Sequence, residues 1–588
     1  MLSKTVGVFG IITIGVAVKK YLAQNVRLPL AEQSENRNGP FHRYYTMHHK
    51  GLHINEGLKQ VGITHQATQI KVNENAEIDL PVVQNSYKEL MTLSGKVVSI
   101  LEKQLHLLKI NEKLYLELQS SIKAWRSFLS TDEIKPDVSR APERFQDSLY
   151  NAYDDDTFDQ EKELRSIAKT EQLKIIMFNL VNVSNKLVLF VGPDSPSITR
   201  KLLSEVSAVL KITNCSTNYN DSLLNVVCGK FLCSLTLNEI GRSLLRSQPY
   251  LNKLITDWTK SNFSCLRLIG LKCVWNLDRP IETIPDGVYV YESISEKKRT
   301  SLDIIWFHGL AGSAFYTWRQ AGPRKDKFLT CWPVDWLVNE IPGNCRIIFL
   351  DYDTLNSDSK LVTKTSESKI ASKENVIESC AHDCFEKLKS IGIGRENPVL
   401  LIGHSMGGLI LKQLLVFDHN EKETRAYPSL LDRVEGILFL STPHLGSPIA
   451  KKIGSLPSRV VKASSVFNEL GDYSKCMLLN SKFMQIMLTE PEIDVINVAE
   501  SLPTEFGFGI SLNIVPLISA YPGFGRFRVL KLDHMRLSKP TGKDDELYNL
   551  VKEFVISHVP LKIEDSDHEN HECVTSNNLF RFVNLDYC

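Results

Sequence analysis

One serine in this sequence stands in a setting that suits nucleophilic chemistry. Ser405 is the centre of the segment 403–407, Gly-His-Ser-Met-Gly, which follows the apolar run 399–402 and precedes the apolar run 409–411. A Gly-x-Ser-x-Gly turn between a buried strand and a helix lifts the serine oxygen off the edge of a sheet, and the glycines let strand and helix approach closely. The sequence therefore predicts a nucleophile at Ser405, with Gly403 and Gly407 as the glycines of the elbow.

A serine hydroxyl needs a base, and in this arrangement the base follows the serine along the chain. His534 comes directly after the apolar run 527–532, where the last loop of a sheet can return over the elbow. His444 also follows an apolar run, but it precedes the acids at the ends of later runs. We therefore expect His534 to be the base and His444 to shape the rim of the pocket.

The third member of such a triad is an acid at the carboxyl end of a strand between the serine and the histidine. Glu500 ends the apolar run that begins at Asp494, and it is the predicted acid on position alone. Asp533 is adjacent to His534 and is poorly placed to reach its ring. Asp472, in a helical stretch, and Asp494, at the other end of the strand, are weaker alternatives.

Acyl transfer also requires donors for a developing oxyanion. The backbone N–H of Met406, directly after the serine, is one expected donor. The segment 308–310, His-Gly-Leu, follows another apolar run, and the N–H of Leu310 is the second. A nucleotide-binding loop is the alternative for these glycines, but the sequence has no Gly-x-x-x-x-Gly-Lys-[Ser/Thr] motif.

Composition limits the other classes of function. The 588 residues carry 69 basic and 68 acidic side chains, a net charge of +1, so bulk charge does not favour a nucleic-acid partner. The 12 cysteines form no dense framework, which fits reduced thiols. Cys380, His382 and Cys384 lie close together, but no second ligand pair at zinc spacing accompanies them, so we expect no metal and no cofactor.

The elements that must position these residues occupy residues 285–563, the predicted catalytic domain. Short apolar runs alternate there with helical segments, which is typical of an α/β fold with a doubly wound, mostly parallel sheet, as in α/β-hydrolases. The runs predict seven strands, at residues 287–292, 302–308, 345–351, 398–403, 436–441, 494–500 and 527–532.

The preceding half of the chain has a different character. Residues 1–30 contain an uncharged run, Thr5 to Val18, that predicts a membrane anchor, with a cleaved signal or a targeting segment as alternatives. Residues 31–84 indicate a linker, residues 85–284 an all-helical domain, and residues 564–588 a polar tail. Within the helical domain four residues recur after 42 positions, which is typical of armadillo or HEAT arrays: Leu224, Val227, Lys230 and Leu235 recur as Leu266, Ile269, Lys272 and Leu277.

Besides the elbow and the His-Gly-Leu loop, two further segments are similar to those of a known protein family. They are Ser-Thr-Pro-His-Leu-Gly-Ser at 441–447 and Asp-His-x-x-Leu-Ser-Lys-Pro at 533–540. The chain resembles the serine active site-containing protein family (SERAC), lipase-like serine esterases. The resemblance implies a phospholipid substrate, remodelling of phosphatidylglycerol acyl chains and a link to intracellular cholesterol traffic. It also implies a membrane-associated protein where endoplasmic reticulum meets mitochondrion.

Two functions are therefore open. The first is a serine hydrolase or transacylase for lipid esters, with Ser405, His534 and Glu500 as the triad. The second is a membrane-tethered scaffold whose helical domain binds a protein partner and whose hydrolase domain has lost its activity.

Overall fold

A computed structural model describes twelve stretches of the chain, the first of which begins at Leu80. The predicted anchor, most of the predicted linker and the polar tail lie outside the described residues. The described stretches are residues 80–103, 112–130, 158–191, 195–213, 219–293, 301–321, 330–354, 376–421, 429–454, 464–490, 492–505 and 511–559.

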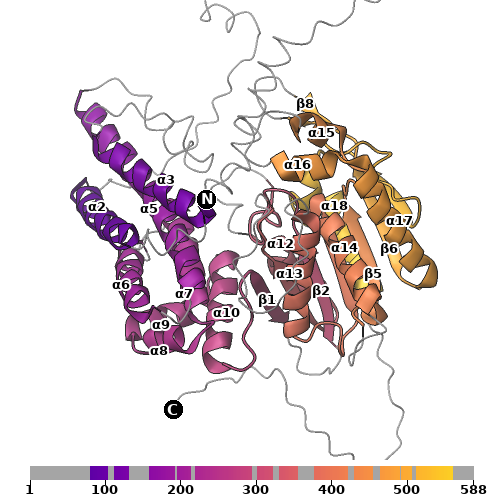
Figure 1. Cartoon of the computed structure of the whole chain (residues 1–588), viewed down its shortest axis with the longest axis horizontal. Helices are drawn as coiled ribbons and strands as arrows, with labels where there is room; N and C mark the ends of the chain where they lie inside the picture. The colour runs from indigo at the N-terminus through magenta and orange to yellow at the C-terminus, as the bar shows by residue number, and fades with distance from the viewer. Residues whose placement is uncertain are drawn as a thin grey trace, which may run out of the picture.

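Helices alone form the part of the described chain that precedes the sheet, as the pattern predicts, and they lie to the left in Figure 1. The long helix α5 packs against α2, α3 and α7, and α10 packs against α7 and α9. These helices are α2 (Leu80–Glu102), α3 (Glu112–Ser130), α5 (Phe158–Val191), α6 (Pro196–Thr213), α7 (Tyr219–Leu235), α8 (Glu239–Arg246), α9 (Pro249–Trp258) and α10 (Ser264–Asp278).

The two copies of the 42-residue repeat fall on α7 and α10, which lie against each other. Gly229 of α7 permits this approach, because a Cβ there would come within 2.8 Å of Ile269 on α10. The armadillo-like arrangement itself stays a prediction.

Among the described residues, one helical segment, Leu173–Phe190 of α5, is long and apolar enough to cross a membrane. Of this segment, 61% is buried against other parts of the chain. Packing against α2, α3 and α7 accounts for its apolar character without a bilayer.

The sheet contains all seven predicted strands, in the order β1-β3-β2-β4-β5-β6-β9. Only β1 is antiparallel to its neighbour, and every other pair is parallel. The doubly wound, mostly parallel sheet of the α/β-hydrolase fold is therefore confirmed. The strands are β1 (Val288–Ser293), β2 (Ser301–Phe307), β3 (Asn344–Leu350), β4 (Val399–His404), β5 (Val434–Leu440), β6 (Asp494–Glu500) and β9 (Arg526–Leu530). A short hairpin of β7 (Thr504–Glu505) and β8 (Ser511–Leu512) was not predicted.

Both faces of the sheet are covered, because alternate residues of a strand point to opposite faces. On β2, Ile304 and Trp306 belong to the core that includes α18, whereas Ile305 and Phe307 belong to the core that includes α13 and α14. The remaining helices are α12 (Trp332–Asp335), η4 (Leu337–Glu340), α13 (Val376–Ser390), α14 (Met406–Glu421), η6 (Leu431–Arg433), α15 (Pro448–Gly454), α16 (Ser464–Gly471), α17 (Tyr473–Thr489), η7 (Arg536–Ser538) and α18 (Glu546–Ser557).

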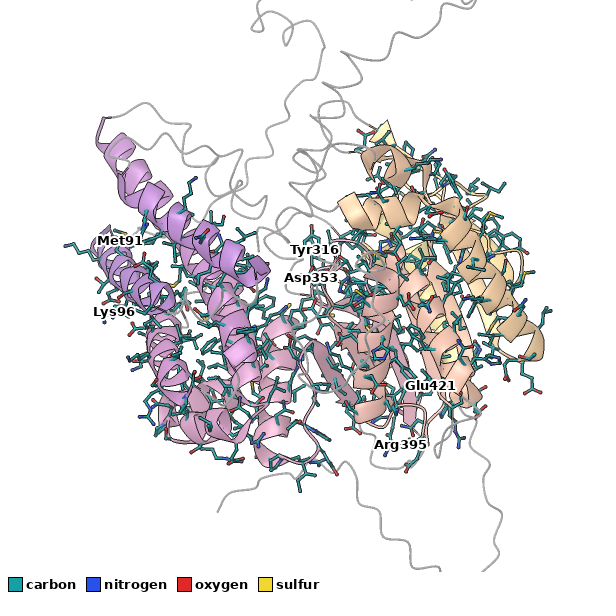
Figure 2. The ribbon with its side chains drawn as sticks, viewed as in Figure 1. Met91, Lys96, Tyr316, Asp353, Arg395 and Glu421 are labelled. Atoms are coloured by element: carbon teal, nitrogen blue, oxygen red, sulfur yellow. The ribbon has the colours of Figure 1, made fainter. Side chains whose placement is uncertain are left out.

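The parallel strands give the sheet two distinct edges. Figure 2 shows Tyr316 and Asp353, which follow β2 and β3, at the carboxyl edge, and Arg395 and Glu421 at the opposite, amino edge. Side chains that follow several strands can meet at the carboxyl edge, which is where ligands bind in open α/β sheets.

Candidate active site

The serine elbow has the backbone that the motif predicts. Ser405 lies between the end of β4 and the start of α14, and its φ of 56° is left-handed, a strained conformation for a residue with a side chain. A Cβ at position 407 would come within 2.3 Å of the carbonyl oxygen of Phe307, and one at 403 within 2.8 Å of Gly408 Cα. Glycine at 403 and 407 therefore lets α14 pack tightly against β2 and β4.

Three predicted residues meet at this elbow. His534 Nε2 lies 2.9 Å from Ser405 Oγ, and His534 Nδ1 lies 2.6 Å from Glu500 Oε2. The side chains of His534 and Glu500 are 7% and 1% exposed, so water competes little for these hydrogen bonds. The geometry is that of a serine, a base within reach of its proton and an acid that orients the base.

The Glu500 carboxylate is held by donors besides His534. The Ser441 hydroxyl donates to Oε2, and the Val515 N–H donates to Oε1 at 3.0 Å. Burial alone would raise the pKa of Glu500, but the charge of His534 and the hydrogen bonds from His534, Ser441 and Val515 together lower it. Glu500 is thus kept ionised beside the imidazole.

Ser441 opens the segment 441–447 that carries the family resemblance, but the sequence analysis assigned it no role. It follows β5 with a left-handed φ of 48°, is fully buried, and lies 3.3 Å from His534 Nδ1 through its hydroxyl. Only the pairing of β5 with β6 brings it to Glu500, 59 residues away. Its position directly after a strand and its place in the segment 441–447 were the available signals.

The alternative acids have other partners. Asp472 caps α17 by accepting hydrogen bonds from the backbone N–H groups of Ser474 and Lys475. Asp494 lies at the amino end of β6 and pairs with Arg526. Asp533 accepts hydrogen bonds from the backbone that follows it at Met535 and Arg536.

His404, inside the elbow, fixes the loop that carries the base. Its Nε2 lies 2.9 Å from the carbonyl oxygen of His534, so Nε2 carries a proton and donates it. Burial, with the nearby charge of His534, holds the pKa of His404 well below its usual range. A neutral His404 therefore clamps the backbone of His534 over Ser405.

His444 is buried completely, so the expectation that it forms a pocket rim is wrong. Its ring packs edge-on against Phe439 with centroids 4.8 Å apart. Its backbone N–H donates to the carbonyl of Ser519 at 2.8 Å. The apolar run before His444 ends in the core of the fold, and the loop that follows turns inward.

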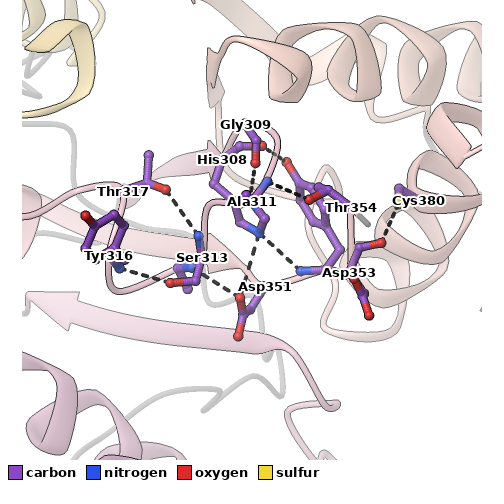
Figure 3. Close-up of polar contacts among 12 residues, drawn as sticks. His308, Gly309, Ala311, Ser313, Tyr316, Thr317, Asp351, Asp353, Thr354 and Cys380 are labelled. Carbon is purple, nitrogen blue, oxygen red and sulfur yellow. Dashed lines mark hydrogen bonds and ion pairs between the residues drawn. The ribbon is translucent and has the colours of Figure 1, made fainter. Parts of the chain in front are cut away.

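The loop after β2 lies directly over the elbow. A Cβ at Gly309 would come within 2.8 Å of Ser405 Cβ, so only glycine permits this approach. Figure 3 shows the contacts that hold the loop. The Tyr352 N–H donates to His308 Nε2 at 3.3 Å, His308 Nδ1–H in turn donates to the Gly309 carbonyl at 2.9 Å, and the Ala311 N–H donates to Thr354 Oγ1 at 2.9 Å.

Leu310 and Met406, the predicted oxyanion donors, flank this contact. In the part of the chain that the structure describes, no protein oxygen accepts a hydrogen bond from either backbone N–H. The adjacent Ser405 N–H, by contrast, donates to the Leu440 carbonyl at 2.9 Å. Two N–H groups beside a nucleophile can serve an oxyanion, and their use in catalysis stays a prediction.

Comparisons with known proteins agree with this fold. Residues 303–486 match the family described as PGAP1-like alpha/beta domain. Protein SERAC1 of Homo sapiens is 32% identical over 296 residues, 48% of this chain and 43% of that protein. Protein SERAC1 of Bos taurus is 30% identical over 344 residues, 55% of this chain and 50% of that protein. The resemblance to the SERAC family is confirmed.

The chain spans about half the length of the curated relatives that it matches. Among solved structures, the mature lipase BlEst2 of Bacillus licheniformis aligns at 15% identity with a TM-score of 0.30, over 45% of this chain and 98% of that one. The fold assignment rests on the strand order and on the PGAP1-like match. The chain thus carries an α/β-hydrolase domain.

Proposed function

We propose that this protein is a serine hydrolase or transacylase that acts on lipid esters through an acyl-enzyme on Ser405. The observation that carries the proposal is the continuous line of hydrogen bonds from Ser405 Oγ through His534 to Glu500, at 2.9 and 2.6 Å. The left-handed Ser405 backbone presents the hydroxyl at the carboxyl edge of the sheet. A fold alone would not imply activity, but this constellation gives each residue a role.

Each step of the reaction follows from these contacts. His534 Nε2 takes the proton of Ser405 as the serine oxygen attacks the ester carbonyl, and Glu500 stabilises the imidazolium. The negative charge that develops on the carbonyl oxygen is expected to lie against the N–H groups of Leu310 and Met406. His534 then returns the proton to the departing alcohol, which leaves the acyl group on Ser405.

The acyl-enzyme is resolved by a second nucleophile. If water attacks, the product is a fatty acid; if the hydroxyl of another lipid attacks, the acyl chain is transferred. His534 activates either nucleophile as a base.

The similarity to SERAC1 proteins supports phospholipid as the substrate class, and within it the remodelling of phosphatidylglycerol acyl chains. The proposal includes a place at membranes of the mitochondrion and endoplasmic reticulum, at their contact sites, and a link to cholesterol trafficking, as the resemblance to the SERAC family implies. The helical domain is a candidate surface for a protein partner. These assignments are part of the proposal.

The test supplies phosphatidylglycerol with a labelled acyl chain to the purified full chain, with and without a lysophospholipid acceptor. Labelled fatty acid identifies a hydrolase, and labelled phospholipid formed from the acceptor identifies a transacylase. Ser405→Ala should lower either rate on the order of 10⁴-fold. Ser390→Ala, at an exposed serine that ends α13, is the matched control.

The scaffold hypothesis is the other outcome of this test. It requires that the wild-type chain turn over no lipid ester and that Ser405→Ala bind partners as the wild type does. Turnover that depends on Ser405 excludes it.

A further inference from the structure

Beside the active site, large apolar side chains are exposed on two neighbouring elements. Met477 and Leu478 of α17 are 54% and 58% exposed, and Leu517 and Ile518 of the segment 516–525 are 49% and 78% exposed. Tyr473 and Tyr521 belong to the same two elements and are also exposed. We call these six residues the apolar rim.

Hydrogen bonds and contacts place the two elements side by side. The Asn480 side chain on α17 donates to the Pro522 carbonyl at 2.9 Å. At the other end, Gly446 lies between Tyr473 and Ser519: a Cβ at 446 would come within 3.2 Å of the Tyr473 ring, and the Ser519 hydroxyl donates to the Gly446 carbonyl at 2.6 Å. The two elements that carry the apolar rim are therefore neighbours at both of these points.

This surface is joined to the catalytic machinery. Val515, directly before the segment 516–525, donates its N–H to Glu500 Oε1 at 3.0 Å. The Leu445 N–H donates to Ser519 Oγ at 3.2 Å, in the loop that follows Ser441. The apolar rim thus borders the carboxyl edge of the sheet, the side to which Ser405 and His534 point.

The charged side chains within these two elements are all basic, whereas Asp472, directly before Tyr473, accepts hydrogen bonds from the backbone N–H groups of Ser474 and Lys475. The 17 residues of α17 include two lysines, Lys475 and Lys482, and no acidic residue. The segment 516–525 contains no charged residue. Lys451 lies over the ring of Tyr473 at 5.3 Å, and both lysines of α17 are exposed.

We propose that the apolar rim is a membrane-docking surface that inserts into the interface of a bilayer containing anionic phospholipid, which brings the active site onto its lipid substrate. Exposed apolar side chains with lysines in excess over acidic residues are a composition that binds such an interface. Clustered exposed apolar side chains mark an interaction surface, and the excess of lysines over acidic side chains favours an anionic partner. The lipid substrate rests on the proposed function, but the docking itself does not.

The first experiment measures contact without catalysis. Full-length Ile518→Trp is bound to phosphatidylcholine vesicles with and without phosphatidylglycerol, and brominated acyl chains quench tryptophans that enter the bilayer. The matched control is Ile281→Trp, because Ile281 is 96% exposed and lies between α10 and β1. We expect added quenching for Ile518→Trp only, stronger with phosphatidylglycerol and weaker at high salt.

Equal quenching of the two variants, or none, overturns the proposal. The proposal is also overturned if the quenching of Ile518→Trp is the same with and without phosphatidylglycerol. If Leu517→Ser/Ile518→Ser instead converts a dimer to a monomer in sedimentation, the apolar rim is an interface between copies of the chain and the proposal is again overturned.

A second experiment uses the proposed activity. We compare the rate of hydrolysis of an ester in vesicles with the rate for a soluble ester. Leu517→Ser/Ile518→Ser should lower the ratio of the first rate to the second by about tenfold or more, because two apolar side chains no longer enter the bilayer. Ile281→Ser should not change the ratio. If Ile518→Trp is quenched but the protein hydrolyses no ester substrate, the proposed function is wrong and the docking surface is still supported.

Discussion

Glu500 is fixed by donors from three separate parts of the chain: the ring of His534, the hydroxyl of Ser441 and the N–H of Val515. Burial raises the pKa of Glu500, but the charge of His534 and the hydrogen bonds favour the ionised form and together lower it. At the scale of single residues, the site depends on keeping this carboxylate ionised and aimed at Nδ1.

Ser441→Ala removes one of these donors, and we expect kcat to fall roughly 10-fold, in line with the loss of a hydrogen bond to a charged group. A lowered folded pKa means that the Glu500 carboxylate contributes stability that is present above its unfolded pKa and is lost as pH falls through the folded pKa. Ser441→Ala raises the folded pKa, so the acid limb of a stability profile should move to higher pH. Steady-state kinetics and acid unfolding measure the two effects.

The variant Ser441→Gly distinguishes the role of the Ser441 hydroxyl from the role of its backbone turn. Glycine accepts the left-handed φ of 48° without strain, so it keeps the turn but loses the donor. If Ser441→Gly had the wild-type kcat and acid limb, the residue would matter only for the turn, and its assigned role as a positioning residue would be wrong.

The sequence predicted the residues that carry a local signature. Ser405 has its glycines and flanking runs, His534 follows a strand, and Glu500 ends one. Ser441 and Tyr352 have no such signature, because their roles arise from neighbours 59 and 44 residues away in the chain. Periodicity and spacing contain no information on which strands pair.

At the scale of elements, the sequence predicted each strand of the main sheet, and most clearly the central strands, which are buried on both faces and nearly continuous in apolar residues. The edge strand β9 is mostly exposed. The short β7–β8 hairpin, whose strands have two residues each, has no such run. The strands predicted from the runs 494–500 and 399–402 have active-site residues at their carboxyl ends. Side chains near the amino ends of the strands contribute to the stability of the fold instead.

An ion pair between β2 and β3 is an example of such a stabilising contact near the amino ends of the strands. Arg346 donates from Nε to Asp303 Oδ1 at 2.6 Å, and the two side chains are 9% and 0% exposed. Arg346→Leu leaves the Asp303 charge buried without this partner and should cost about 3 to 5 kcal/mol of unfolding free energy. Chemical denaturation measures the loss.

Because Arg346 and Asp303 pair near the amino ends of their strands, kcat per folded molecule should be unchanged in Arg346→Leu at a permissive temperature. Asp303→Leu/Arg346→Leu should recover much of the lost stability, since the buried Asp303 charge is then removed as well. A single variant as stable as the wild type would contradict the account of this pair.

At the scale of the whole molecule, an ion pair connects the helical domain to the loop over the elbow. Lys230 of α7 lies 2.8 Å from Asp351, which follows β3. Asp351 also accepts a hydrogen bond from the Ala314 N–H at 3.3 Å and lies 3.7 Å from His308. The repeat that marked Lys230 in the sequence did not reveal this contact, because its partner is 121 residues away.

Lys230→Met removes a charge that faces the nearly buried Asp351, so we expect the loop after β2 to loosen and kcat to fall by about tenfold. Arg126→Met, which breaks an exposed ion pair with Glu102 inside the helical domain, is the control and should have no effect on kcat. Hydrogen exchange of the loop should increase in Lys230→Met only. Unchanged exchange and kcat would mean that the helical domain does not support the loop.

The central claim is that Ser405 is an activated nucleophile, and a fluorophosphonate tests it most directly. The purified full chain is treated with the probe, digested and analysed by mass spectrometry, beside Ser405→Ala and Ser390→Ala. We predict one phosphonylated peptide containing Ser405, with labelling lost in Ser405→Ala, retained in Ser390→Ala and slowed at least 10²-fold in His534→Ala. An unlabelled wild-type chain, or labelling that survives Ser405→Ala, would contradict the account.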